Sequence, residues 1–195
     1  MKTLVVIGSR LAIICTAAAL VLALINAITA PVIEENKRIA LERGLLAIAE
    51  QAPQRGITVG LPLDPGRTAD RDDISNAYQL LDADGELAAF VVQLVGTGYG
   101  GDMMLLAGYE LDGTLFAATL MENQETPGLG KKAEDPAYME KFIGFGGQTP
   151  IPTSKTELDP ADADAITGAT ITFLGVSNAL LSGSEFVASL GGTVW

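Results

Sequence analysis

Three threonines surround a glycine-alanine step near the C-terminus, at the start of a segment with helical apolar spacing: Thr167, Gly168, Ala169, Thr170 and Thr172. Glycine lets the backbone come close to a ligand, and the free N–H groups at a helix N-terminus favour an anion such as phosphate. The hydroxyls can donate to that anion or react with it. Because threonine is also a common N-cap residue, the run taken alone favours a simple helix cap.

A second run with turn-forming residues lies about forty residues earlier, with the sequence Glu125-Thr126-Pro127-Gly128-Leu129-Gly130. Pro-Gly is a strong turn signal, and a residue before proline is pushed to extended geometry. Glycines are also dense between residues 96 and 101. That segment fits a bulge or crossover in a sheet, or a place where the backbone approaches a flat ligand, and both alternatives stay open.

The amino-acid composition excludes several kinds of active site. The chain has no histidine and a single cysteine, Cys15. Ser-His-Asp catalysis, haem ligation by histidine, the usual zinc sites, intrachain disulfides and thiolate clusters are therefore excluded. We assign no side chain a catalytic or metal-binding role, and we expect the chemistry to depend on a cofactor.

The N-terminus predicts a membrane anchor. Leu11 to Ile33 contains no charged side chain, and this stretch of about 23 residues forms a helix roughly 35 Å long. A cleaved signal peptide is the alternative, but its apolar core is usually about 7–15 residues long. Pro31 after Ala30 makes a poor cleavage junction, although a cut after Ala27 stays open. We predict an anchor in residues 1–33 and an extracytoplasmic domain in residues 34–195.

The charge distribution limits the partners of the domain. The net charge is −12, and all 24 acidic residues follow Ile33. A domain this acidic has no basic patch for nucleic acid or for anionic lipid headgroups. Lysines and arginines near the two ends of the anchor are equal in number. The short leading segment with its free amine favours a cytoplasmic N-terminus.

The apolar patterns predict an α+β fold: an antiparallel sheet of hairpins with flanking helices, preceded by one N-terminal transmembrane helix. Asp-Gly steps predict the two hairpin turns. Segments 57–73 and 145–164 are predicted loops. The expected strands are 78–81, 87–95, 103–111 and 115–121, and the expected helices are 34–51, 136–142 and 171–190.

Together, the two runs resemble the FMN-binding domain of bacterial respiratory complexes. The chain resembles in particular the G subunit of the Rnf ferredoxin:NAD oxidoreductase, and it is similar also to the C subunit of the sodium-pumping NADH:quinone reductase. The resemblance covers nearly the whole chain. In that family the pattern is Ser/Thr-Gly-Ala-Thr-x-Thr, and a flavin transferase that uses FAD esterifies the last threonine to the phosphate of FMN. The resemblance therefore implies an FMN-binding domain in residues 34–195, with covalent FMN on Thr172.

The resemblance also implies roles for the neighbours of Thr172. Thr167, Gly168, Ala169 and Thr170 would shape the loop and receive the phosphate. The Gly128-Leu129-Gly130 segment would lie along the isoalloxazine ring, with Glu125 and Thr126 available for hydrogen bonds near it. A surface position is the alternative for Glu125, as for most loop glutamates. The chain departs from the family pattern at Gln124, where a basic residue or histidine is frequent, and at Thr167, where serine is commoner.

The implied function is electron transfer within an ion-translocating complex of the inner membrane, without independent substrate turnover. The implied partners are the other Rnf subunits, the flavin transferase during maturation, and the membrane, with no nucleic acid. A domain of this length favours the Rnf branch over the longer quinone-reductase subunit. An FMN-domain sensor, or a structural subunit whose threonines only cap a helix, remain alternatives.

Overall fold

The computed structural model describes residues 2–54, 56–158 and 169–191. The chain divides into two compact units, Met1–Glu42 and Arg43–Trp195. The helices and strands are α1 (Lys2–Ala49), β1 (Thr58–Pro62), η1 (Pro65–Arg67), β2 (Ile74–Leu81), β3 (Leu87–Thr97), β4 (Asp102–Glu110), β5 (Leu115–Glu122), η2 (Gly130–Glu134), α2 (Pro136–Met139), η3 (Glu140–Phe142), η4 (Lys155–Glu157) and α4 (Thr170–Gly191).

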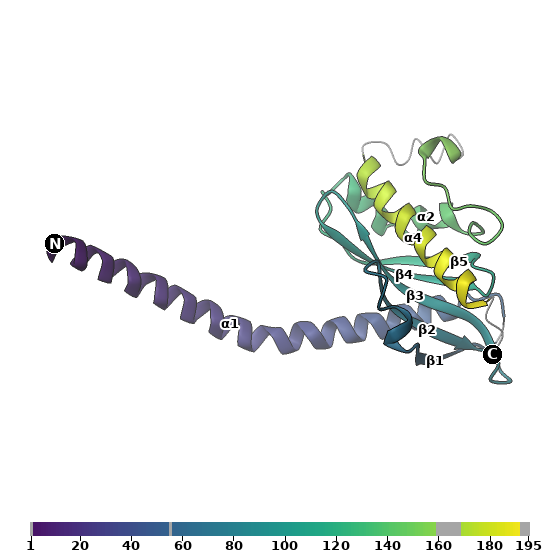
Figure 1. Cartoon of the computed structure of the whole chain (residues 1–195), viewed down its shortest axis with the longest axis horizontal. Coiled ribbons are helices and arrows are strands. Elements are labelled where there is room, and N and C mark those ends of the chain that lie inside the picture. Colours follow the sequence, from purple (N-terminus) through teal and green to yellow (C-terminus); the bar gives the residue numbers. More distant parts are fainter. Residues whose placement is uncertain (1, 55, 159–168, 192–195) are drawn as a thin grey trace. The chain divides into compact units, whose positions relative to one another are not determined.

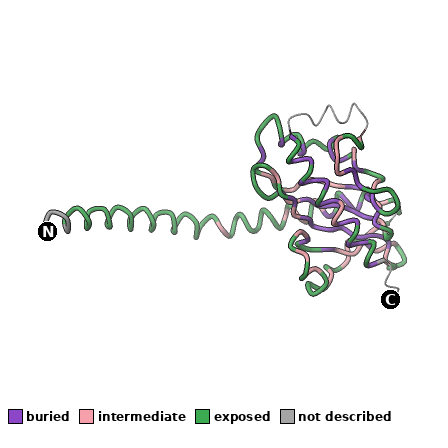
Figure 2. The backbone as a smooth tube through the Cα atoms, turned by 45° about the horizontal axis from the view of Figure 1, so that its top comes forward, coloured by how far each residue is buried: buried purple, intermediate pink, exposed green. Residues whose placement is uncertain are grey.

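The first unit is the greater part of the long helix α1. Every residue from 6 to 29 is exposed, including large apolar side chains such as Leu22 and Ile28 (Figure 2). The helix runs through Pro31 without ending there. Its apolar stretch is long enough to cross a bilayer by length and composition. A helix with apolar side chains on all sides suits lipid better than water.

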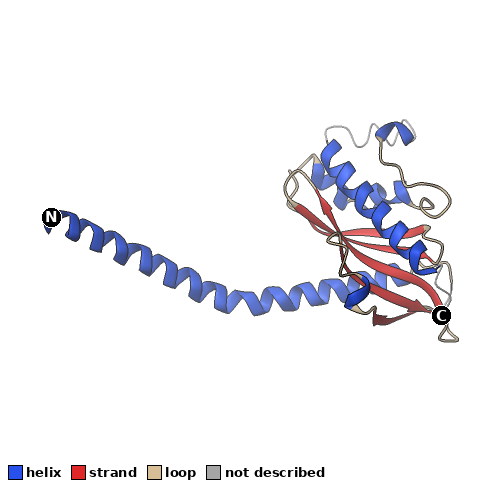
Figure 3. Ribbon diagram, in the orientation of Figure 1, coloured by secondary structure: helices blue, strands red, loops and turns tan. Residues whose placement is uncertain are grey.

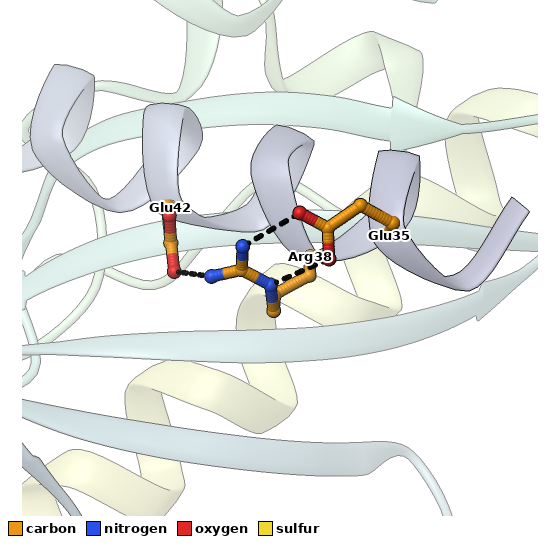
Figure 4. Close-up of polar contacts among 3 residues, drawn as sticks. All are labelled: Glu35, Arg38 and Glu42. Carbon is orange, nitrogen blue, oxygen red and sulfur yellow. Dashed lines mark hydrogen bonds and ion pairs between the residues drawn. The ribbon is translucent and has the colours of Figure 1, made fainter. Parts of the chain in front are cut away.

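A cluster of charged side chains follows the apolar stretch of α1 (Figure 4). Arg38 contacts Glu35 through two hydrogen bonds of 2.7 and 3.0 Å and Glu42 through one of 2.5 Å. These spacings of three and four residues place the charges on one side of the helix. The bonds from Arg38 lower the pKa of the Glu35 carboxyl. These charged side chains suit water, so the exposed apolar part of α1 ends before them.

The second unit contains a five-stranded antiparallel sheet in which each strand pairs with its sequence neighbour, in the order β1-β2-β3-β4-β5 (Figure 3). Two turns use an aspartate and a glycine with positive φ. Asp82 accepts hydrogen bonds from two backbone N–H groups beside Gly85, and Asp112 accepts one beside Gly113. Both predicted hairpins are confirmed, because the left-handed backbone of these turns favours glycine.

Helices cover both faces of the sheet. Helix α4 lies across one face, mainly over β3 and β4 (Figure 1). Its predicted apolar face is confirmed, since Phe173, Val176 and Leu180 have no exposed surface. The last turns of α1 cover the other face, where Gly44 and Ile48 approach β4. The sheet is therefore buried on both sides, and α4, which is also long and apolar, is the core helix of the domain.

The sheet differs from prediction at its first edge and in its middle. Residues 58–62 form β1 rather than a loop, and β2 begins at Ile74 rather than at residue 78. A strand ending in Pro62 is tolerated at an edge, where its missing N–H breaks no ladder. Gly96 and Thr97 belong to β3 and pair with β4, so the glycine-rich segment is a hairpin turn and no crossover. The predicted short helix at 136–142 is present as α2 followed by η3.

Candidate functional site

A cavity of about 550 Å³ opens at the N-terminal end of α4. It lies among the turn between β3 and β4, the loop that leads from β5 into η2, and the first turn of α4. Its volume falls within the range of about 300–1,000 Å³ that is usual for ligand pockets. The lining residues are Tyr99, Glu125, Thr126, Leu129, Gly130, Ala169, Thr170, Ile171 and Thr172.

Thr172 occupies the first turn of α4. The helix starts where the Phe173 N–H donates to the carbonyl of Ala169, at 2.9 Å. Only 2% of the Thr172 surface is exposed, and its hydroxyl Oγ1 donates to Oε2 of Glu125 at 2.5 Å. The predicted acceptor is therefore bonded to a carboxylate and lines the cavity.

Glu125 is held by its neighbours as well as by Thr172. The side chain is 3% exposed, so the alternative of a surface carboxylate is wrong. Its second oxygen, Oε1, accepts a hydrogen bond from the Gly100 N–H at 2.7 Å. Its own N–H donates to the side-chain oxygen of Asn123, whose amide group donates in turn to Glu134. The turn between β3 and β4 and the segment after β5 thus fix this carboxylate in place.

Glycines around Glu125 allow the backbone to come this close. A Cβ on Gly130 would lie 2.7 Å from the Thr172 hydroxyl oxygen and would overlap the Glu125 carboxylate. A Cβ on Gly98 would also overlap that carboxylate, and one on Gly100 would overlap the carbonyl of Gln124. Side chains at these positions would push the carboxylate and the hydroxyl apart. The glycine-rich turn therefore serves the packing of Glu125.

The structure brings together most of the predicted site. Glu125, Thr126, Leu129 and Gly130 lie opposite Ala169, Thr170 and Thr172 around the cavity. Gly128 does not line it; its φ of +80° forms the turn that places Leu129 and Gly130. Thr167 and Gly168 lie outside the described residues.

Sequence reasoning identified Leu129 on the apolar rim of the cavity, but it assigned no role to Tyr99 or Ile171 and did not identify the residues that hold Glu125. Tyr99 is 74% exposed, Ile171 51% and Leu129 45%, and all three line the cavity. Exposed apolar groups around an opening suit a flat aromatic ligand. The sequence does single out Tyr99 as a candidate ligand contact, because it is the one aromatic residue in the glycine-rich segment 96–101. Gly100 holds Glu125 through its backbone N–H and Asn123 through its side-chain oxygen, and no sequence pattern predicts either contact.

The electrostatics of the cavity come from the helix and from one carboxylate. The described residues that line it include Glu125 and no lysine or arginine. The first N–H groups of α4 have no acceptor within the helix, so they and the threonine hydroxyls can hold a phosphate. Burial, and next the charge of Glu125, raises the pKa of Tyr138. Among the described residues, no group of three or more cysteine, aspartate or glutamate side chains could hold a metal ion.

These residues fit a flavin phosphate. The buried hydroxyl of Thr172 and the open N–H groups of α4 suit the phosphate, and the apolar rim suits the ring system. The poor fit is Glu125, whose charge would repel a phosphate beside Thr172 unless it carried a proton. The residues around the cavity can therefore hold the flavin phosphate, provided that the Glu125 carboxyl is neutral when the phosphate lies beside it.

Comparisons with known proteins identify the same region. Residues 98–183 match the family described as FMN-binding domain. The chain is 30% identical to the G subunit of the Na⁺-translocating ferredoxin:NAD⁺ oxidoreductase complex of Acetobacterium woodii over 186 residues, which cover 91% of this chain and 88% of that relative. It is 28% identical to the G subunit of the ion-translocating oxidoreductase complex of Methanosarcina acetivorans, over 83% of this chain and 84% of the relative.

A solved structure shows the same fold. The crystal structure of Shewanella oneidensis NqrC superposes with a TM-score of 0.59 at 20% identity, and the match covers 81% of this chain and 99% of that one. At this identity the likeness concerns the fold alone. The relatives named above match at higher identity over nearly their whole length, and the FMN-binding domain family matches the segment that contains the cavity. The chain therefore belongs to the family of G subunits of ion-translocating (Rnf) oxidoreductase complexes.

Proposed function

We propose that this chain carries FMN bound covalently to Thr172 and transfers electrons within an ion-translocating ferredoxin:NAD oxidoreductase complex. The observation that carries the proposal is the position of the Thr172 hydroxyl, which lines a flavin-sized cavity at the positive end of α4. A phosphate attached there meets the open N–H groups of the first helical turn. An attached flavin supplies one- and two-electron transfer chemistry.

The chain's own residues bind and orient the flavin. Thr170 and the backbone of Ala169 flank the phosphate, with Thr167 and Gly168 proposed beside them from the sequence pattern. Leu129 and Gly130 lie on one side of the cavity and supply an apolar surface for the ring, and Thr126 supplies a hydroxyl nearby. We propose that the attached flavin relays electrons and that the chain turns over no small substrate by itself.

The membrane and the other subunits complete the proposal. Residues 1–33 anchor the chain by one helix, and residues 34–195 form the domain on the extracytoplasmic side of the inner membrane. The apolar, exposed stretch of α1 supports the anchor. A covalent bond keeps the cofactor on a domain outside the cytoplasm. The partners are the other subunits of the complex, and a flavin transferase that uses FAD during maturation.

The test is attachment of flavin at residue level. The full chain is produced with and without a flavin transferase, purified in detergent, and examined by intact mass, by flavin fluorescence on a denaturing gel and by peptide mapping. We expect the mass of one FMN on the peptide that contains Thr172, and none in Thr172→Ala. Thr58→Ala is the matched control and should keep the label, since this exposed threonine lies on β1 and does not line the cavity.

Other results would favour the alternatives. A labelled Thr172→Ala variant, or a label on another peptide, would contradict the attachment site. An unlabelled wild-type chain from cells that contain the flavin transferase would favour a structural subunit. Labelled protein that copurifies with quinone-reductase subunits, rather than with a ferredoxin:NAD oxidoreductase, would place the chain in the related complex.

A further inference from the structure

Thr172 differs from an ordinary surface threonine in what its hydroxyl contacts. Oγ1 donates to Glu125 Oε2 at 2.5 Å, and both side chains are almost completely buried. A threonine hydroxyl is a weak nucleophile, and an adjacent base is a common means of activating one. A distance of about 2.6–3.2 Å or less is within reach for a proton transfer. The pair therefore has the geometry of a nucleophile and its general base.

We propose that Glu125 is the general base for flavin attachment at Thr172, so that this chain contributes a catalytic residue to its own modification. The inference rests on the proposed covalent FMN. The Thr172 oxygen attacks the flavin-bearing phosphorus of FAD, and its proton passes to Glu125 Oε2. An oxygen–phosphorus bond forms, the phosphoanhydride bond of FAD breaks, and AMP leaves with the electron pair. No atom is oxidised or reduced.

The surroundings of Glu125 suit this role. Oε1 is fixed by the Gly100 N–H, so Oε2 stays directed at the threonine. Among the described residues, Glu125 forms no ion pair with lysine or arginine. The charge of Glu125 contributes, after burial, to the raised pKa of Tyr138, and Glu134 lies beyond Asn123. The Thr172 hydroxyl is therefore the donor directed at Oε2, and the carboxylate is placed to receive its proton.

The proton transfer also resolves the poor fit between Glu125 and a phosphate. An ionised carboxylate would lie against the negatively charged product. Once it has taken the proton of Thr172, the carboxyl is neutral and can donate a hydrogen bond to a product oxygen. The same side chain thus activates the hydroxyl and loses its charge as the phosphoester forms. We expect a single carboxyl at this position to serve both steps.

The experiment measures the rate of attachment in the full chain. Flavin-free protein in detergent is mixed with purified flavin transferase, FAD and Mg²⁺, and the label is followed by gel fluorescence and intact mass. Glu125→Gln keeps the size of the side chain and an oxygen that accepts from Gly100, but it removes the base. We expect the initial rate to fall about a hundredfold or more, within the usual contribution of general-base catalysis.

Control variants separate catalysis from charge and from structure. Glu140→Gln makes the same charge change on an exposed side chain and should label at the wild-type rate. Glu125→Asp keeps the carboxylate but shortens the side chain, which moves the carboxylate away from Thr172. This variant should label at an intermediate rate. In Glu125→Ala, added formate should restore part of the rate, which a merely positioning side chain would not allow. Circular dichroism and urea unfolding establish that each variant is folded.

Each outcome bears on the proposal. A folded Glu125→Gln chain that labels within about threefold of wild type overturns it, while labelled wild type and unlabelled Thr172→Ala leave the attachment site intact. A wild-type chain that does not label overturns the proposed function instead. Should Glu125→Gln fail to fold, Glu125→Ala decides: a folded Glu125→Ala chain that labels at the wild-type rate, or whose rate formate does not raise, also overturns the proposal.

Discussion

Helix α4 carries a buried hydroxyl toward each of its ends, and the two differ in what they contact. Thr172, near the N-terminus, donates to the Glu125 carboxylate and lines the cavity. Ser184, three turns later, donates to the Gly113 carbonyl at 2.8 Å and accepts from the Gly147 N–H at 3.2 Å. The two residues are 2% and 4% exposed. Burial alone therefore does not distinguish a reactive hydroxyl; its partner and its access to a cavity do.

The same difference extends to the tyrosines near the two ends. Tyr109 donates to the carbonyl of Leu180 at 2.8 Å, beneath the middle and later turns of α4. Tyr138, whose pKa responds to Glu125, has a buried hydroxyl with no hydrogen-bond partner among the described residues. Tyr109 and Ser184 are thus bonded to backbone groups, whereas Thr172 is bonded to a carboxylate and the Tyr138 hydroxyl is unpaired. The backbone bonds of Tyr109 and Ser184 stabilise the fold, and of the four hydroxyls it is that of Thr172 that lines the cavity.

The largest expected effect comes from the glycines that face the two hydroxyls. Gly130→Ala places a methyl group against Glu125 and the Thr172 hydroxyl, and should lower flavin attachment at least tenfold. Gly113→Ala places one 2.6 Å from the Ser184 carbonyl at a φ of +92°, and should leave attachment intact but cost about 1–3 kcal/mol of unfolding free energy. Labelling rates and urea unfolding measure both. If Gly130→Ala and Gly113→Ala labelled at the same rate, the Thr172 and Ser184 ends of α4 would not differ in their importance for flavin attachment.

The next effect concerns stability at Ser184. Ser184→Ala leaves the Gly113 carbonyl and the Gly147 N–H without this partner, so the free energy of unfolding should fall by about 1–3 kcal/mol. Thr172→Ser keeps the bond to Glu125 and should lose less than about 1 kcal/mol, mainly through the missing methyl group. Urea unfolding of the flavin-free chain compares the two. If Thr172→Ser lost more unfolding free energy than Ser184→Ala, the Thr172 hydroxyl and its surroundings would also serve mainly to stabilise the fold.

The tyrosines should respond to loss of their hydroxyls in opposite directions. Tyr109→Phe removes the partner of the Leu180 carbonyl and should lower the free energy of unfolding by about 1 kcal/mol. Tyr138→Phe removes an unpaired buried hydroxyl and should leave stability unchanged or raise it by up to about 1 kcal/mol. Thermal unfolding at neutral pH measures both shifts. A clear loss in Tyr138→Phe would reveal a partner for that hydroxyl.

The smallest effect is on stability in alkali. Burial raises the pKa of Tyr109, and burial together with the Glu125 charge raises that of Tyr138. The unfolded chain then loses these protons first, so the stabilisation is complete below the unfolded pKa of about 10 and declines as pH rises above it. The decline reaches at most about 1.4 kcal/mol per pH unit for each tyrosine. Urea unfolding at pH 9 and pH 10.5 should show a shallower decline in Tyr138→Phe than in wild type.

Most of the secondary structure could be predicted because it depends on local pattern. The apolar spacing of Phe173, Val176 and Leu180 indicated a buried helix face, and the Asp-Gly steps indicated two hairpins, all present in the structure. Strand β1 was missed because its pairing with β2 makes it a strand, whereas its own glycine and proline favour a loop. Propensity is a weak guide wherever a tertiary partner supplies the backbone hydrogen bonds.

The candidate site was predicted only in part. The sequence pattern singled out Thr172 and the loop containing Leu129 and Gly130, but it gave Glu125 a place near the flavin ring or at the surface. In the structure Glu125 is buried, and its carboxylate accepts a hydrogen bond from the Thr172 hydroxyl. The two residues are 47 positions apart, and no spacing rule relates them. A third segment, the turn between β3 and β4, supplies Tyr99, which lines the cavity, and Gly100, which donates to Glu125.

By itself, the sequence determined the apolar N-terminal helix, the helix and hairpin content, the absence of histidine chemistry and the threonine that could hold a phosphate. These properties depend on composition and on residues a few positions apart. The tertiary structure decided which carboxylate meets that threonine, which glycines make room for it, and that the cavity has an apolar rim. Those features depend on segments distant in the chain, which only packing of α4 against the sheet and its loops brings within hydrogen-bonding distance.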